Sequence, residues 1–267
     1  MTHETLDFEL ENGLASITLN RPDVLNSMNE IMLRELLDVT EHLSSDASVR
    51  AVLLTGTGRG FCAGADLAEA VAAGGTRDDR GRRAKDAMVR YYNPIALNLS
   101  RMPKPVVCAV NGIAAGGGVG LALSCDVVFA AQSAAFVQVF VPQLGIIPDV
   151  GSTWFLPRLL GNARAMGLML SGEKLSAQRA EQWGLIWKCC EDEKLMTEAA
   201  GFAQKLAQGP TQGIASTKQA LQSAAHNNLE AQLQLEADVQ RWCCASEDAQ
   251  EGFHAFVEKR QPHFKGR

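Results

Sequence analysis

The stretch PVVCAVNGIAAGGGVGLALS, residues 105–124, joins two apolar runs through a glycine turn, and the second run begins with three consecutive glycines. Consecutive apolar positions rich in β-branched residues are typical of a strand buried on both faces, so residues 105–112 predict such a strand. The segment GGGVGLALS (116–124) predicts an apolar helix that begins at the glycines. The stretch therefore predicts a strand, a turn and a buried helix, which together form a unit of an α/β fold.

The same order of features occurs earlier in the chain. AVLLTG (51–56) is a second short apolar run, and the glycines of TGTGRGFCAGAD (55–66) and the helical pattern GADLAEA follow it. Further upstream, the alternating segment LASITLN (14–20) predicts a strand, and residues 29–43 predict a helix. Because the unit is repeated, the first part of the chain is predicted to be an α/β core.

The second part of the chain reads differently. After residue 155 the apolar residues recur every three to four positions, with glycine or proline at the breaks, which predicts helices alone. We expect a core over residues 1–205 and a helical C-terminal region over 206–267, packed on the core or on a sister subunit. The polar stretch AAGGTRDDRGRRA (72–84) predicts a solvated, mobile loop.

Composition and charge exclude several functional classes. The chain has 25 basic and 30 acidic residues, a net charge of −5, and no run of eighteen apolar residues. We therefore expect no binding to nucleic acid and no membrane segment. Its odd number of cysteines, seven, and the absence of a signal-peptide pattern at the start indicate a cytoplasmic protein. Neither the cysteines nor the histidines have the spacing of metal ligands, so no metal site is expected.

The two glycine clusters do not match a nucleotide-binding motif. The glycines at 56, 58 and 60 and those at 116–118 and 120 both miss the G-x-G-x-x-G frame, and the chain has no phosphate-binding P-loop sequence. One interpretation is that the glycines only permit tight turns and close helix packing. The other is that each cluster exposes main-chain N–H groups at the start of a helix, and two such turns facing one point form an oxyanion hole.

Several longer segments resemble a known family. GRGFCAGADL, PVVCAVNGIAAGGGVGLALSCD, AFVQVFVPQLGIIPDVGSTWFLPRLLG and EGFHAFVEKRQPHF are similar to segments of the crotonase family of enoyl-CoA hydratases and isomerases, along essentially the whole chain. The resemblance implies a crotonase-like spiral of ββα units with a helical C-terminal trimerisation region. It also implies an acyl-CoA substrate, no cofactor beyond the coenzyme A that is part of that substrate, and a homotrimer or hexamer.

The resemblance assigns roles to individual positions. The oxyanion donors are expected to be the main-chain N–H groups of Ala65 and Gly117. Residues along the coenzyme A are expected at Leu25 and over the stretch Ala63, Ala65, Asp66 and Leu67. Phe256 and Lys259 near the C-terminus are possible contacts to the coenzyme A of a neighbouring subunit, although Lys259 fits a solvated helix end equally well.

The acidic residues decide which reaction the resemblance implies. Members that hydrate a double bond carry two glutamates, and these align with Gly120 and with a position near Val141, neither of which is acidic. Asp149, in GIIPDVGST (145–153), aligns instead with the single acid of members that isomerise acyl-CoAs. The alternative is that Asp149 only caps a helix beginning near Gly151. We expect a proton shuttle, provided that burial raises the pKa of Asp149.

Within the family, segments such as YYNPI and IIPDVGSTWFLPRL resemble most the ring-epoxide isomerases of phenylacetate degradation, which convert an epoxidised phenylacetyl-CoA to its oxepin. The alternatives are a Δ3,Δ2-enoyl-CoA isomerase or an enoyl-CoA hydratase of fatty-acid oxidation, and, in another class, a catalytically silent acyl-CoA binder. Tyr91 and Tyr92 fall where this fold walls the acyl pocket, with packing as their default role.

Overall fold

Strand–strand–helix units build the core of the protein, whose computed structural model describes residues 3–267. The strands are β1 (Leu6–Glu11), β2 (Leu14–Leu19), β3 (Ala51–Gly56), β4 (Gly60–Cys62), β5 (Val106–Val110), β6 (Ile113–Ala115), β7 (Val127–Ala131), β8 (Ala135–Val137), β9 (Leu175–Ser176) and β10 (Lys188–Cys190). The α-helices are α1 (Glu30–Ser45), α2 (Leu67–Ala72), α3 (Arg77–Ala87), α4 (Asn93–Arg101), α5 (Gly117–Leu123), α6 (Ser152–Leu160), α7 (Asn162–Ser171), α8 (Ala177–Trp183), α9 (Leu195–Ala207), α10 (Thr211–Ala224), α11 (Leu229–Cys244) and α12 (Glu247–Glu258). Shorter helical turns are η1 (Pro22–Val24), η2 (Met88–Tyr92), η3 (Phe140–Leu144) and η4 (Asp192–Lys194).

Each repeated unit contributes one strand to each of two sheets. The first strands, β3, β5 and β7, are parallel neighbours in a six-stranded sheet of order β1-β2-β3-β5-β7-β10. The second strands, β4, β6 and β8, are parallel neighbours in a four-stranded sheet of order β4-β6-β8-β9. Because every unit adds to the same two sheets, the chain winds as a spiral, and the predicted α/β fold is confirmed.

The core is apolar because the central strands of the larger sheet are covered on both faces. Every residue of β3 and of β5 is buried, as their unbroken apolar runs predicted. Helix α1 packs with apolar residues spaced three to four apart, among them Met32, Leu36 and Leu43, and Asn29 caps it by accepting from the N–H of Met32. The predicted helix over 29–43 is confirmed.

The smaller sheet sets where the candidate site lies. Strands β4 and β6 run in parallel, with Cys62 opposite Ala114, so their carboxyl ends meet at one edge of the sheet. The chain leaves β4 through the turn at Gly64 and leaves β6 through the turn at Gly116. The two glycine clusters of the sequence therefore come together, although about fifty residues separate them along the chain.

Residues 72–84 differ from the expectation of a mobile loop. Helix α3 begins at Arg77, and Thr76 and Asp79 form a reciprocal capping box at its start. Arg82 pairs with Asp78 and Asp79, one helical turn earlier. Local capping and ion pairs thus support a helix that has no buried residue, and only the expectation of solvation was right.

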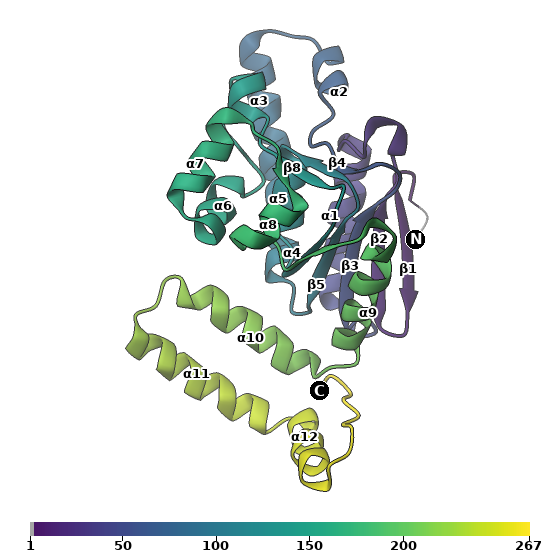
Figure 1. Cartoon of the computed structure of the whole chain (residues 1–267), viewed down its shortest axis with the longest axis vertical. Helices are drawn as coiled ribbons and strands as arrows, with labels where there is room; N and C mark the ends of the chain where they lie inside the picture. Colours follow the sequence, from purple (N-terminus) through teal and green to yellow (C-terminus); the bar gives the residue numbers. More distant parts are fainter. Residues whose placement is uncertain (1–2) are drawn as a thin grey trace.

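The C-terminal helices extend from one end of the core, and side chains of α10 bond to it. In Figure 1, α10, α11 and α12 gather at one end of the molecule, whereas α2 and α3 lie at the other. The side chain of Arg50 bonds to Thr211 and to the main-chain oxygens of Gly209 and Phe264, and so fixes the start and end of this region to β3. Within residues 3–267, no helix is long and apolar enough to cross a membrane.

Candidate active site

The two glycine turns touch one another. Gly64 has a left-handed φ of +91°, and a Cβ built on it would lie 2.9 Å from the carbonyl oxygen of Ala115 and 3.1 Å from the amide nitrogen of Gly117. Only glycine allows both this conformation and this close approach. The main chain just before Ala65 is therefore in contact with the first residue of α5.

The amide of Ala65 is left free by its neighbours. Ala65 forms a parallel bridge with Met28, in which the N–H of Met28 donates to the oxygen of Gly64 (2.7 Å) and the N–H of Asp66 donates to the oxygen of Met28 (3.0 Å). In such a bridge the flanking residues make the hydrogen bonds. The N–H of Ala65 itself points away from Met28, and the protein uses its neighbours to hold it there.

The amide of Gly117 is free for a different reason. Gly117 is the first residue of α5, so its N–H has no carbonyl one turn earlier in the helix to bond to. Gly116 before it has a left-handed φ of +52° and donates its own N–H to the oxygen of Val137. Two main-chain donors from separate turns thus come together at the edge of the smaller sheet.

Asp149 stands beside Gly117. A Cβ built on Gly117 would lie 3.6 Å from Oδ1 of Asp149 and 3.2 Å from a methyl group of Val150. Asp149 does not cap the following helix, because α6 begins at Ser152 with Gly151 as its N-cap residue and has no side-chain cap. Only the main-chain oxygen of Asp149 takes part, accepting from the N–H of Ser152 (2.9 Å). The capping alternative is therefore wrong, and the carboxylate is left for another role.

The environment of Asp149 disfavours its charge. Burial raises the pKa of its carboxyl from the ordinary 3.8 to about 6, and a contact with its own main-chain N–H opposes this only weakly. Among residues 3–267, no basic side chain forms an ion pair with it. An acid with a pKa near 6 exchanges protons readily at neutral pH, which general acid–base chemistry requires.

Tyr92 lies near this carboxylate and near the Cys62 thiol, and both Tyr92 and Cys62 stay neutral. Tyr92 is buried, at the end of η2, and its pKa is raised by burial and then by the charge of Asp149. Burial also raises the pKa of the Cys62 thiol to about 12. Of these three groups, only Asp149 changes charge near pH 7.

Asp66 has the opposite environment. Its carboxylate accepts from Nη1 of Arg21 (2.9 Å) and from the N–H of Glu69 (3.2 Å), so it pairs with a cation and caps α2. Burial opposes its ionisation, yet these bonds prevail and the pKa is lowered. The stretch that contains Asp66 is expected along the coenzyme A, and within it the Asp66 side chain holds the turn that contains Ala65.

Comparison with known proteins places this geometry in a family. The model of the enoyl-CoA hydratase/isomerase family matches residues 9–267, which is almost the whole chain. The chain belongs to the enoyl-CoA hydratase/isomerase, or crotonase, family. The resemblance noted in the sequence is thereby confirmed, and so is the crotonase-like fold.

Individual relatives of this family agree along their whole length. A protein of Escherichia coli called 1,2-epoxyphenylacetyl-CoA isomerase is 48% identical, over 97% of this chain and 97% of its own. A probable enoyl-CoA hydratase of Rhodobacter capsulatus is 43% identical over 100% of both chains. The crystal structure of a putative enoyl-CoA hydratase/isomerase from Mycobacterium abscessus superposes with a TM-score of 0.93 at 35% identity, covering 98% of this chain and 100% of that one.

Other positions expected from this family are arranged as follows. The N–H of Ala63 donates to the oxygen of Leu25 (2.9 Å), so Leu25 lies beside the stretch that leads through Ala65 to the half-exposed Leu67. Phe256 is almost fully exposed on α12, and Lys259 ends that helix in a left-handed conformation. In Figure 1, α12 lies at the opposite end of the chain from α2, so these two residues do not reach the turns of their own chain.

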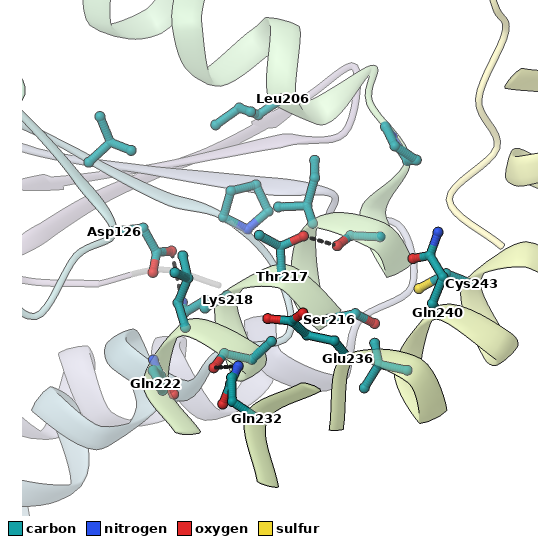
Figure 2. A pocket seen from close by; sticks show the side chains of 18 of the residues that line it. Asp126, Leu206, Ser216, Thr217, Lys218, Gln222, Gln232, Glu236, Gln240 and Cys243 are labelled. Carbon is teal, nitrogen blue, oxygen red and sulfur yellow. Dashed lines mark hydrogen bonds and ion pairs between the residues drawn. The ribbon is translucent and has the colours of Figure 1, made fainter. Parts of the chain in front are cut away.

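A separate groove lies in the C-terminal part of the molecule. Its volume is about 1210 Å³, and it is lined by α9, α10, α11 and the start of β7. Figure 2 shows that Lys218 pairs with Asp126 within it (2.8 Å). None of Ala65, Gly117 or Asp149 lines this groove. It belongs to the C-terminal helical region, and the candidate site is defined by the converging turns instead.

Sequence reasoning missed two contributors to the site. Arg21 pairs with Asp66 across 45 positions, and no local pattern indicates that partner. Val150 has a left-handed φ of +47°, which a β-branched residue rarely adopts, and it packs on Gly117. The sequence indicates that Val150 lies in a turn, between Asp149 and Gly151. It does not indicate that the φ of Val150 is positive.

Proposed function

We propose that the protein is an acyl-CoA isomerase in which Ala65 and Gly117 hold an enolate and Asp149 alone moves the proton. The observation that carries the proposal is the carboxylate of Asp149, which is partly buried, unpaired among the described residues, and beside the free amide of Gly117. A thioester α-proton is only weakly acidic, so a base needs help from groups that stabilise the enolate.

The two main-chain amides supply that help. As charge develops on the thioester oxygen, the N–H groups of Ala65 and Gly117 donate to it in a site that is already organised. One donor of this type contributes about 2.7 to 4 kcal/mol to the barrier reduction in enzymes where it has been removed. Because both donors are main-chain groups, the identity of residue 65 matters less than the geometry of its turn.

Asp149 then acts first as a base and next as an acid. The ionised carboxylate takes a proton from one carbon of the substrate, and the protonated carboxyl returns a proton to another carbon of the delocalised enolate. The atoms of substrate and product are the same, so the step needs no water and no second acid. A pKa of about 6 keeps both forms accessible near neutral pH.

The substrate we favour is ring-1,2-epoxyphenylacetyl-CoA, converted to its oxepin in phenylacetate degradation. The relative that carries this activity in its name is 48% identical over 97% of both chains. The alternative within the same chemistry is the interconversion of 3-enoyl-CoA and 2-enoyl-CoA. Coenzyme A enters as part of the substrate, and residues Leu25, Ala63, Ala65, Asp66 and Leu67 are the proposed lining of its path.

Hydration is the second candidate, because a relative that is 43% identical is called a probable enoyl-CoA hydratase. Hydrating members carry two glutamates, which align with the buried Gly120 and with a position near the half-exposed Val141, and neither position is acidic in this chain. A single carboxylate is left to activate water and to protonate carbon. We therefore favour isomerisation over hydration.

We further propose that the protein works in the cytoplasm as a homotrimer or hexamer, and that Phe256 and Lys259 contact the coenzyme A of a neighbouring subunit. Both residues are far from the turns of their own chain, so a contact requires another subunit. Measuring the mass of the protein in solution, with and without acyl-CoA, tests the oligomeric state.

Turnover of a small acyl-CoA panel tests the function. The panel contains the phenylacetyl epoxide, a 3-enoyl-CoA and a 2-enoyl-CoA, and products are identified by mass and chromatography. We expect isomers of unchanged mass from the epoxide and from the 3-enoyl-CoA. A product heavier by one water would favour the hydratase, and binding of all three without turnover would identify a catalytically silent binder.

A further inference from the structure

A contact between α5 and the Asp149 turn leaves no room for a side chain at residue 120. A Cβ built on Gly120 would lie 2.2 Å from the main-chain oxygen of Val150 and 2.6 Å from its Cβ. Real Cβ atoms do not approach other atoms to within 3.0 Å. The nearest atom belongs to the main chain, so it cannot rotate away as the end of a flexible side chain does.

Helix α5 cannot retreat from this contact. On its other side, a Cβ built on Gly118 would lie 2.1 Å from the carbonyl oxygen of Cys62 in β4. Residues 118 and 120 are separated by roughly 200° around a helix, so they present nearly opposite faces. The helix is therefore held between two main chains, with a glycine at each contact, and a bulkier residue 120 has to move the Asp149 turn.

The turn itself holds an unfavourable conformation. Val150 is buried and has a φ of +47°, and Gly151 after it has a φ of +74°. A β-branched residue in this region persists only where the surroundings impose it. Here the surroundings are α5, because the Val150 side chain rests 3.2 Å from the Cβ position of Gly117.

We propose that Gly120 and Val150 are a matched pair of positioning residues that seat the Asp149 carboxylate beside the amide of Gly117. The missing side chain at 120 lets the main chain of Val150 sink onto α5, and the left-handed Val150 turns Asp149 toward the oxyanion donors. This inference rests on the role proposed above for Asp149.

The contact between Gly120 and Val150 also affects whether the site favours isomerisation or hydration. Residue 120 is where hydrating relatives carry a glutamate, and in this protein Val150 occupies that space. An acid at residue 120 therefore displaces the Asp149 turn instead of adding a second catalytic group. We expect Gly120→Glu to lose isomerisation without gaining hydration.

The test compares Gly120→Ala with Gly201→Ala, a matched substitution on α9 where a Cβ meets nothing within 4 Å. Crystal structures of wild type and of Gly120→Ala are expected to differ in the 149–151 turn, moved away from α5. We expect kcat of Gly120→Ala to fall about 100-fold with little change in KM, as small displacements of a catalytic group do. The acid limb of its kcat–pH profile should move below pH 6, because the displaced carboxylate meets more water. Gly201→Ala should match wild type in every measurement.

A second variant covers the case in which Gly120→Ala does not fold. Val150→Gly tolerates the left-handed φ and removes the side chain that rests on Gly117, so it should fold. Without the Val150 side chain, the 149–151 turn loses its contact with Gly117. We therefore expect a lower kcat and the same shift of the acid limb of the kcat–pH profile. A lower kcat of Val150→Gly, measured well below the melting temperature of the variant, supports positioning, whereas a wild-type kcat and an unmoved acid limb in Val150→Gly overturn the proposal.

Two results separate this inference from the proposed function. If wild type turns over no acyl-CoA but the 149–151 turn moves in Gly120→Ala, the matched pair stands and the isomerase role of Asp149 fails. If wild type isomerises and Gly120→Ala keeps both its kcat and its seated turn, the isomerase stands and the matched pair is overturned.

Discussion

Asp66 and Asp149 are two aspartates near the starts of helices in the same candidate site, and they have opposite environments. Asp66 is paired with Arg21 and caps α2, and its pKa is lowered. Asp149 neither pairs nor caps among the described residues, and burial raises its pKa to about 6. The residue type is the same, but Asp66 is the N-cap residue of its helix whereas Asp149 lies two residues before the N-cap residue Gly151, so position and partners together decide the role. One carboxylate is structural because its charge is satisfied, and the other is available for chemistry because its charge is not.

Replacing each aspartate by asparagine should give the largest difference in kcat between the two sites. We expect Asp149→Asn to lower kcat for 3-enoyl-CoA isomerisation by about 10³-fold, since an amide cannot carry the proton. Asp66→Asn should lower kcat less than about tenfold, because it loosens only the support of the Ala65 turn. Initial rates of both variants on the same substrate measure the difference. Equal losses in the two variants would contradict the distinction.

The pH dependence of the rate should report Asp149 and not Asp66. The base must be ionised to accept a proton, so kcat of wild type should fall about tenfold per pH unit below about 6. Asp66 remains ionised over this range because its pKa is lowered. A rate profile from pH 4.5 to 8 is the measurement. A rate that stays constant down to pH 5 would show that the base is not a group with a pKa near 6.

Stability should change with pH in the direction set by the raised pKa. Between the ordinary value of 3.8 and about 6, the folded state binds more protons at Asp149 than the unfolded state does. The contribution of Asp149 to the free energy of unfolding is therefore lost as pH rises from about 4 to about 6. Asp149→Asn removes the loss, so we expect it to stabilise the protein at pH 8 by roughly 1 to 3 kcal/mol and to have no effect near pH 4. Urea unfolding at both pH values measures this.

Asp66 should give a smaller effect of the opposite sign. Its pKa is lowered by Arg21 and by the cap, so its contribution is present at neutral pH and is lost as pH falls below its ordinary value. We expect Asp66→Ala to destabilise the protein at pH 8 by about 1 kcal/mol, mainly through loss of the cap. Arg21→Met keeps the cap and should cost less. Stabilisation by Asp66→Ala in the same unfolding experiment would mean that its charge is not satisfied.

The sequence predicted the parts of the site that repeat and left open those that depend on distant partners. The repeated strand, glycine turn and helix offered two turns that could face one point, and the family resemblance assigned Ala65 and Gly117 within them. A raised pKa of Asp149 was a condition for its expected role, and the burial of its carboxyl meets that condition. Whether Asp149 caps α6 could not be decided, because that depends on the φ angles of Val150 and Gly151.

Polar segments and long-range pairs were also beyond the sequence reasoning. Residues 72–84 have no apolar stripe, so periodicity could not find α3, and its capping box was the available signal. Arg21 was not connected with Asp66, since nothing in the order of residues says which loops meet. Only the folded structure distinguishes Asp66, whose charge is paired, from Asp149, the candidate for catalysis.

Exchange of the α-proton of phenylacetyl-CoA in heavy water tests the central claim most directly. This substrate has neither an epoxide nor a double bond to move, so it reports only enolate formation by the two amides and the one acid. We predict that wild type and Asp66→Asn incorporate deuterium at the α carbon, measured by mass, and that Asp149→Asn does so no faster than the uncatalysed reaction. Exchange by Asp149→Asn at the wild-type rate, or no exchange by wild type with the ligand bound, would contradict the account.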